Sequence, residues 1–153
     1  MAIVDLETEL AAPAPSVWRA VKTPGAFRTV TRGVLTMPVI KNRGDDWHED
    51  ETVAGWVFLF GLIPFSRHTL HISRIDDNAM TLSSRESGGI LRRWNHDIVV
   101  TAAGDSRCHY RDRIDIDAGI FTPAVVVYAR WFYKTRQRRW RELAKELAMH
   151  GPR

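Results

Sequence analysis

The chain has 153 residues, of which 44% are hydrophobic and 26% are charged, and its formal net charge is +4. These values are typical of a soluble globular protein, and the length favours one domain, residues 1–153. Because the sequence has one cysteine, Cys108, an internal disulfide bond is excluded. The apolar stretch from Val53 to Phe65 is too short to cross a bilayer. We therefore expect a cytoplasmic protein without stable membrane insertion, while the composition leaves the oligomeric state open.

The N-terminal region predicts one strand followed by two short helices. Residues Ile3 to Leu10 alternate between apolar and polar side chains, as in a half-buried strand. The segment 11–16 contains two prolines, which end the strand and precede a short helix beginning at Ser16. Residues 23–25 end that helix, and residues 26–30 are expected to form a further helical turn or two.

From Gly33 onward the period of the apolar residues changes to two, and turn-forming residues punctuate the pattern. This predicts strands near residues 33–41, 47–60, 65–75, 79–87, 91–102 and 107–117. Gly119 and Pro123 bracket the start of a long helix that runs to about Met149. The expected fold is α+β, with about seven strands in a curved antiparallel sheet and one long helix against its concave face. A gap between such a sheet and helix is a common place for a small-molecule site.

Each strand of the last predicted hairpin carries an ionisable residue on its apolar face. His96 shares a face with Trp94 and Ile98, and Asp112 shares one with Tyr110. With a turn at residues 103–107, two registers are possible. One sets His96 opposite Asp112, and the other sets Ile98 there, with His96 one step diagonal. Both registers predict a His96–Asp112 contact, which is either a satisfied buried pair or part of the wall of a ligand cavity.

The basic residues of the long helix divide into two sets. The outer set forms a stripe typical of a solvated helix face and consists of Lys134, Arg138, Arg141 and Lys145. Arg136 and Arg139 lie on the inward edge instead. Arg136 is a candidate for contacting an anionic ligand group, whereas Arg139 is placed to pair with Glu142 and Glu146. Because no known nucleic-acid-binding motif is present, we expect no nucleic-acid partner.

The order of elements, together with the segment 12–18 after the first strand, resembles the START / birch-pollen-allergen-like superfamily of helix-grip domains (SRPBCC). The chain is most similar to its bacterial polyketide cyclase/dehydrase-like members. Further stretches that carry the resemblance are 59–64 with Arg67 and His68, 94–96, 112–114, and Tyr133 with 136–140. The resemblance covers essentially the whole chain and implies a helix-grip fold. It does not specify a reaction, because this superfamily includes lipid carriers, receptors and cyclases.

The sequence has no glycine-rich phosphate motif and no nucleophile elbow. His68 and His71 are expected on opposite strand faces, and His68, which shares a face with Leu70 and Ile72, is expected to be a hydrogen-bonded lining residue rather than a metal ligand. No cofactor or metal is therefore predicted. The predicted function is binding of a hydrophobic small molecule between the sheet and the C-terminal helix. One alternative is a cyclase or dehydratase in which Asp112 orients His96 as a general base. A second is a structural or partner-binding domain without a ligand. The predicted ligand-binding residues are Trp56, Phe58, Trp94, Tyr110, Tyr128, Phe132 and Arg136.

Overall fold

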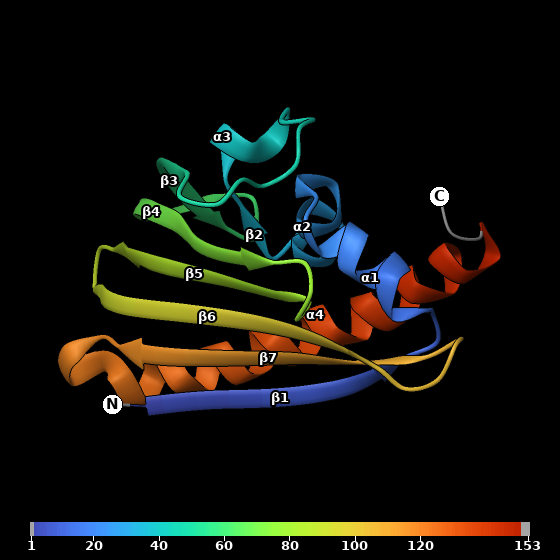
Figure 1. Cartoon of the computed structure of the whole chain (residues 1–153). Helices are drawn as coiled ribbons and strands as arrows, with labels where there is room; N and C mark the ends of the chain where they lie inside the picture. Colours follow the sequence, from blue (N-terminus) through green and yellow to red (C-terminus); the bar gives the residue numbers. More distant parts are fainter. Residues whose placement is uncertain (1, 151–153) are drawn as a thin grey trace.

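The computed structural model describes residues 2–150, and these form a seven-stranded antiparallel sheet in the order β1-β7-β6-β5-β4-β3-β2 (Figure 1). The strands are β1 (Ala2–Leu10), β2 (Leu35–Thr36), β3 (Thr52–Leu59), β4 (Ile63–Asp76), β5 (Thr81–Gly88), β6 (Leu91–Ala102) and β7 (Cys108–Asp117). The helices are α1 (Ala14–Val21), α2 (Pro24–Thr31), α3 (Pro38–Lys41) and α4 (Thr122–Met149), with a 3₁₀ turn, η1 (Gly119–Phe121), before α4. The predicted fold class is confirmed.

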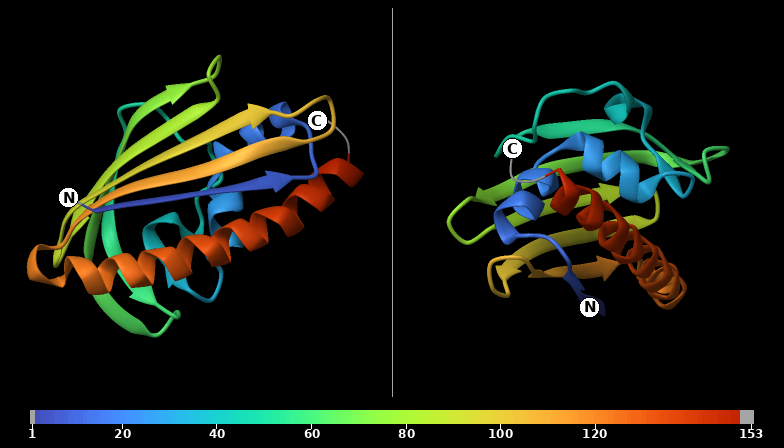
Figure 2. Two further views of the ribbon diagram at one scale, coloured as in Figure 1. Left: turned by 90° about the horizontal axis from the view of Figure 1, so that it is seen from below. Right: turned by 90° about the vertical axis from the view of Figure 1, so that its right-hand side faces the viewer.

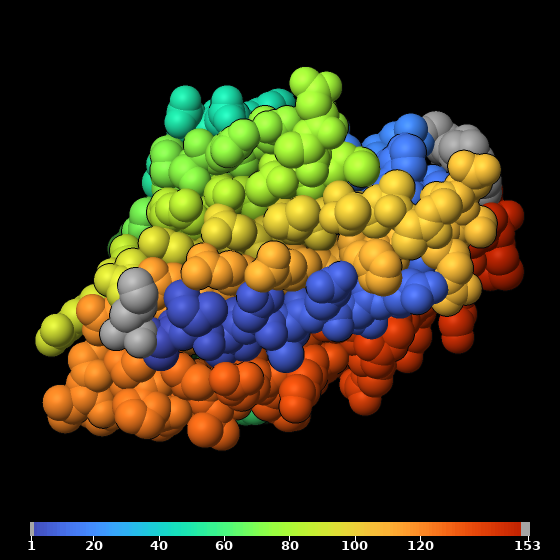
Figure 3. Space-filling model, turned by 60° about the horizontal axis from the view of Figure 1, so that its bottom comes forward, coloured from blue at the N-terminus to red at the C-terminus, as the bar shows by residue number. Residues whose placement is uncertain are grey.

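Helix α4 lies along the concave side of the sheet, and α1 and α2 lie near the C-terminal half of α4 (Figure 2). The opposite, outer face shows β1, β7 and β6 side by side, with α4 emerging beyond β1 (Figure 3). The helix begins where the Thr122 hydroxyl accepts a hydrogen bond from the Ala118 backbone N–H and Pro123 occupies the first turn. Its buried residues Phe132, Tyr133 and Trp140 recur at helical spacing, so one face of α4 packs toward the sheet.

Two predicted strands differ from the structure. The segment 33–41 contains only the two-residue strand β2, followed by the short helix α3. Pro38 explains this difference, because it cannot donate to a strand ladder and its fixed φ suits the first turn of a helix. The strand predicted at 47–60 begins at Thr52, since residues before it form a turn in which Asp50 adopts a positive φ of 65°. The remaining strands and helices agree with the sequence to within a few residues.

The register of the β6–β7 hairpin is the second of the two predicted alternatives. Ile98 lies opposite Asp112, and His96 lies opposite Ile114. The Ala103 N–H bonds the Arg107 carbonyl at the turn, which closes the hairpin at this length. His96 is therefore diagonal to Asp112 on the inner face of the sheet, within reach of its carboxylate.

Two further findings concern the helices. Arg139 does not pair with Glu142 or Glu146 as predicted. Its guanidinium instead donates to the Val30 carbonyl at 3.3 Å and to the Arg32 carbonyl, at the C-terminal end of α2. Unsatisfied carbonyls at a helix end attract cations, which explains this preference. Within residues 2–150, no helix has the length and apolar character needed to cross a membrane.

Candidate functional site

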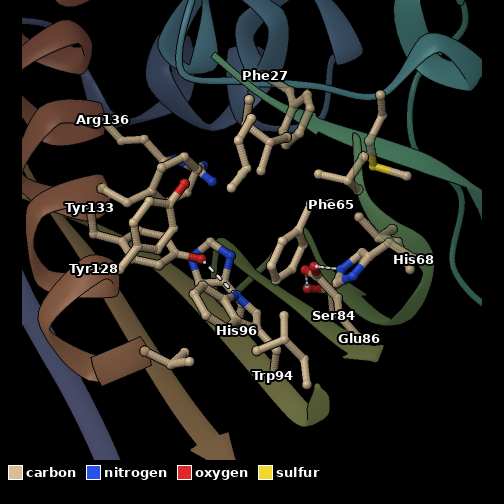
Figure 4. Close-up of a pocket in the computed structure, with 18 of the residues that line it drawn as sticks. Phe27, Phe65, His68, Ser84, Glu86, Trp94, His96, Tyr128, Tyr133 and Arg136 are labelled. Carbon is tan, nitrogen blue, oxygen red and sulfur yellow. Dashed lines mark hydrogen bonds and ion pairs between the residues drawn. The ribbon is translucent and has the colours of Figure 1, made fainter. Parts of the chain in front are cut away.

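A cavity of about 370 Å³ lies between the inner face of the sheet and α4 (Figure 4). Strands β4, β5 and β6 supply one wall, α4 supplies the facing wall, and α2 with the segment after it covers one end. Most of the lining side chains are apolar, including Leu70, Leu82, Ile98 and Phe132. A concave, mostly apolar space with a few polar groups has the character of a small-molecule site.

The cavity opens beside the first turn of α4. Three apolar side chains that line it are also partly exposed to solvent: Phe65 (41%), Ile90 (41%) and Phe121 (51%). They come from the start of β4, the β5–β6 turn and η1, so this edge of the cavity is its mouth. The opposite end is formed by buried residues, among them Arg136 and Trp140, and is closed.

Asp112 lies on the inner face of β7 and is fully buried, with 0% of its surface exposed. Its carboxylate accepts three side-chain hydrogen bonds, from His96 Nε2 at 2.7 Å, Tyr110 Oη at 3.1 Å and Gln137 Nε2 at 3.0 Å. Gln137 also donates to the Leu6 carbonyl of β1 at 2.9 Å. The carboxylate therefore joins β6, β7 and α4 in one buried hydrogen-bond network.

The protonation of this network follows from the contacts of Asp112. Burial by itself would raise the pKa of Asp112, but the hydrogen bond and charge of His96, the charge of Arg136 and the hydrogen bond from Gln137 outweigh it, so that this pKa is lowered. An ionised carboxylate can only accept hydrogen bonds, so the His96 nitrogen facing it, Nε2, carries a proton. In neutral His96, Nδ1 is then the basic nitrogen, on a side chain that lines the cavity.

A second polar group on the cavity wall contains His68, which was expected to line the cavity, and two residues that were not predicted from the sequence, Glu86 and Ser84. Glu86 of β5 bonds His68 Nε2 of β4 at 2.8 Å and accepts from the Ser84 hydroxyl at 2.6 Å, and all three residues line the cavity. Burial would raise the pKa of Glu86, but the hydrogen bond and charge of His68 and the Ser84 hydroxyl outweigh it and lower this pKa. The available signal was the period-two face shared by Leu82, Ser84 and Glu86. Because serine and glutamate usually face solvent, this pattern did not indicate an inner face of the strand.

Helix α4 contributes its own polar groups to the cavity. The Tyr133 hydroxyl accepts a hydrogen bond from Trp94 Nε1 at 3.0 Å, which ties α4 to β6. The Tyr128 hydroxyl and the Arg136 Nε are both buried and have no hydrogen-bond partner within residues 2–150. Figure 4 shows Tyr128, Tyr133 and Arg136 projecting from the helix toward the sheet. Burial raises the pKa of the Tyr128 hydroxyl, which keeps it a donor at neutral pH.

The structure brings most of the predicted site residues together. His96 and Asp112 are in contact, in the diagonal arrangement described above. Asp112 lies behind His96 and does not itself line the cavity. The predicted ligand-binding residues that do line it are Trp94, Tyr128, Phe132 and Arg136. Among residues 2–150, no group of three His, Cys, Asp or Glu side chains is placed to hold a metal ion.

Three predicted lining residues lie elsewhere. Trp56 and Phe58 point away from the cavity, because Val57 and Leu59 take the inner positions of β3, and Trp56 is 49% exposed. Tyr110 does face inward, but it is covered by Trp140 of α4, with ring centroids 5.0 Å apart. Both faces of β3 carry apolar residues, with Val57 and Leu59 on one and the large aromatics Trp56 and Phe58 on the other, so the period-two pattern does not identify the inner face. The inner face of β3 was therefore predicted wrongly.

Solved structures with this architecture come from plants and bacteria. Norcoclaurine synthase from Thalictrum flavum, in complex with dopamine and hydroxybenzaldehyde, matches with a TM-score of 0.70 and 13% identity over 99% of this chain and 89% of that one. A START superfamily protein from Mycobacterium smegmatis matches with a TM-score of 0.69 and 10% identity over 95% and 98% of the two chains. An aromatase/cyclase from a Streptomyces species matches with a TM-score of 0.59 and 16% identity over 94% and 88%.

At these identities the likeness establishes the fold alone, which is the helix-grip fold predicted from the sequence. No curated protein shows significant similarity to the sequence. A family model described as a domain of unknown function (DUF8410) matches residues 8–145, which include every polar group of the cavity described above. The chain therefore belongs to the DUF8410 family.

Proposed function

We propose that this protein binds a hydrophobic small molecule in the cavity between the sheet and α4. The observation that carries the proposal is the cavity of about 370 Å³ with a mostly apolar lining and an open mouth. A domain whose inner face served only for packing would fill this space with side chains, since protein interiors are close-packed. The cavity therefore argues against the alternative of a structural domain without a ligand.

Apolar burial supplies the driving force for such binding. A ligand that buries roughly 200 Å² of apolar surface gains about 5 kcal/mol before the costs of association are subtracted. Trp94 from β6 and Phe132 from α4 lie on facing walls, so a flat or extended apolar molecule can contact both. The expected ligand class is a lipid, a polyketide or a similar lipophile.

Titration with the neutral fluorescent probe N-phenyl-1-naphthylamine tests the proposal. We expect saturable binding by the wild-type protein and loss of binding in Ala124→Trp, which places a large side chain at the mouth of the cavity. The matched control is Val127→Trp, one turn further along α4, where the side chain is 70% exposed and does not line the cavity. Native mass spectrometry of protein purified from its own host would then reveal a co-purifying lipophile. Probe binding that survives Ala124→Trp would contradict binding in this cavity.

A second candidate function, a cyclase or dehydratase, is favoured by one specific observation. The His96 side chain lines the cavity, and the buried carboxylate of Asp112 holds its Nε2 at 2.7 Å. An imidazole held by a carboxylate in this way is suited to act as a general base, because the ring is oriented and its tautomer is set. In this function His96 would remove a proton next to a substrate carbonyl, and Asp112 would be its positioning residue.

Hydrogen–deuterium exchange of a bicyclic ketone, 2-tetralone, distinguishes the enzyme from the carrier. In deuterated buffer, NMR directly follows the rate at which 2-tetralone exchanges its α-protons. The cyclase-type function predicts that the wild-type protein accelerates this exchange and that His96→Gln does not. His68→Gln serves as the matched control, because His68 also lines the cavity but is bonded to Glu86. Saturable binding of 2-tetralone without any acceleration would leave the carrier function alone.

A further inference from the structure

The Arg136 guanidinium is a cation buried at the closed end of the cavity. The residue is 6% exposed, and its Nε has no hydrogen-bond partner within residues 2–150. Its Cζ lies 5.9, 5.8 and 5.2 Å from the ring centroids of Phe27, Phe132 and Tyr133. Cation–π contacts of this kind offset only part of the cost of removing a guanidinium from water. The site is therefore short of hydrogen-bond acceptors.

The two carboxylates of the same region do not make up this deficit. Asp112 already accepts from His96, Tyr110 and Gln137. Glu86 is held by His68 and Ser84 on the opposite wall. Both carboxylates stabilise the charged form of Arg136 through space, yet neither is in ion-pair contact with it within the part of the chain that the structure describes. The donors of Arg136 are thus left for a group that enters the cavity.

A second donor without a partner lies on the same helix face. The Tyr128 hydroxyl is buried and has no hydrogen-bond partner within residues 2–150, and Tyr128 also lines the cavity. Its ring stacks on Phe132 with centroids 5.9 Å apart, and Arg136 contacts that same Phe132 ring. Two buried donors with no acceptor, one of them permanently charged, match the needs of an acidic group that carries two oxygens.

We propose that the cavity takes a hydrophobic molecule bearing a carboxylate, with Arg136 binding the carboxylate at the closed end. This inference rests on the proposed binding function and specifies its ligand class. The planar guanidinium can hold both carboxylate oxygens at once, and Tyr128 can donate to one of them. The apolar part of the ligand then extends along the walls toward the mouth at Phe65 and Phe121.

The test compares two ligands that differ only in their head group. The affinities for dodecanoate and dodecan-1-ol are measured by displacement of bound N-phenyl-1-naphthylamine at pH 8, where the carboxylate is ionised. For the wild-type protein we expect dodecanoate to bind at least about tenfold more tightly than the alcohol. In Arg136→Gln, the affinity for dodecanoate should fall roughly 10- to 100-fold, as expected for lost hydrogen bonds to a charged group. The affinity for dodecan-1-ol should stay within about threefold.

Three variants make the result specific. Arg138→Gln removes an exposed arginine from the same helix and should leave both affinities unchanged. Arg136→Lys keeps the charge without the planar fork and should retain part of the preference for dodecanoate. Tyr128→Phe should lower the affinity for dodecanoate severalfold and leave the affinity for dodecan-1-ol unchanged. Thermal unfolding and probe affinity of each variant verify that the cavity is intact.

The possible failures are distinguishable. If the probe and dodecan-1-ol bind but the wild-type protein does not prefer dodecanoate, the carboxylate inference is overturned and the proposed function stands. If Arg136→Gln weakens both ligands equally, Arg136 supports the cavity structurally and the inference is again overturned. If neither the probe nor either ligand binds saturably, the proposed function itself is overturned, and the inference falls with it.

Discussion

Replacing Asp112 by alanine removes an acceptor that serves three buried donors at once. These donors belong to His96, Tyr110 and Gln137, at distances of 2.7, 3.1 and 3.0 Å. Removing one partner of a buried charged pair typically costs about 3–5 kcal/mol, because the groups left behind stay desolvated without a partner. The Arg136 charge would also lose a stabilising neighbour. We therefore expect Asp112→Ala to lower the free energy of unfolding by about 3–5 kcal/mol.

Urea unfolding at pH 7, followed by tryptophan fluorescence, measures this loss, provided that the slope with urea is unchanged. The matched control is Asp97→Ala in the same hairpin. Asp97 lies on the outer face and pairs with Arg85 at 3.3 Å, with its side chain 30% exposed. An ion pair of this kind contributes at most about 1 kcal/mol. A loss well under 1 kcal/mol for Asp112→Ala, or equal losses for both variants, would refute the buried network.

The pH dependence gives an independent check. The contacts of Asp112 hold its pKa below the usual value, so the unfolded chain binds a proton at this position more readily than the folded protein. The stability from the carboxylate is therefore complete above the unfolded pKa of roughly 4 and is lost as the pH falls through the folded pKa. The stability difference between wild type and Asp112→Asn should narrow as the pH decreases below about 5. A difference that widens toward acid pH would contradict this assignment.

Burial raises the pKa of the Cys108 thiol to about 11. Iodoacetamide at pH 8 should therefore alkylate the native protein about 100-fold more slowly than the urea-unfolded chain, and mass spectrometry measures both rates. Gly88→Ala should cost about 1–3 kcal/mol in urea unfolding, because its Cβ would lie 2.3 Å from a carbonyl oxygen of β4, whereas Gly44→Ala, which has open space, should be tolerated. Trp56→Ala should leave the affinity for N-phenyl-1-naphthylamine unchanged in a fluorescence titration, whereas Trp94→Leu should lower this affinity about tenfold, because Trp94 lines the cavity and Trp56 does not.

The elements that could be predicted are those whose side chains alternate cleanly. In β6 and β7 one face is apolar over most of the strand, so the inward positions of His96 and Asp112 followed from period two alone. The exact register did not follow, because two turn geometries fit the segment between the strands equally well. The short helix α3 was missed because the alternation of residues 33–41 outweighed the single indication from Pro38.

The candidate site was less predictable than the fold because its walls come from strands with mixed faces. Glu86 and Ser84 lie inside only because His68 of the neighbouring strand satisfies the carboxylate, and no pattern within β5 indicates that partner. The inward position of Arg136 followed from helical periodicity. The absence of an acceptor for its Nε among residues 2–150 could not be predicted, because it depends on where Asp112 and Glu86 direct their oxygens.

The orientation of the proposed carboxylate ligand follows from the position of the closed end of the cavity. An amphiphile that entered with its tail first would leave its carboxylate in water at the mouth and press hydrocarbon against the Arg136 guanidinium. That arrangement leaves a buried cation without an acceptor, so tail-first entry costs more free energy than carboxylate-first entry. Entry with the carboxylate first exchanges the water around that group for the donors of Arg136 and Tyr128 and leaves the tail among apolar side chains.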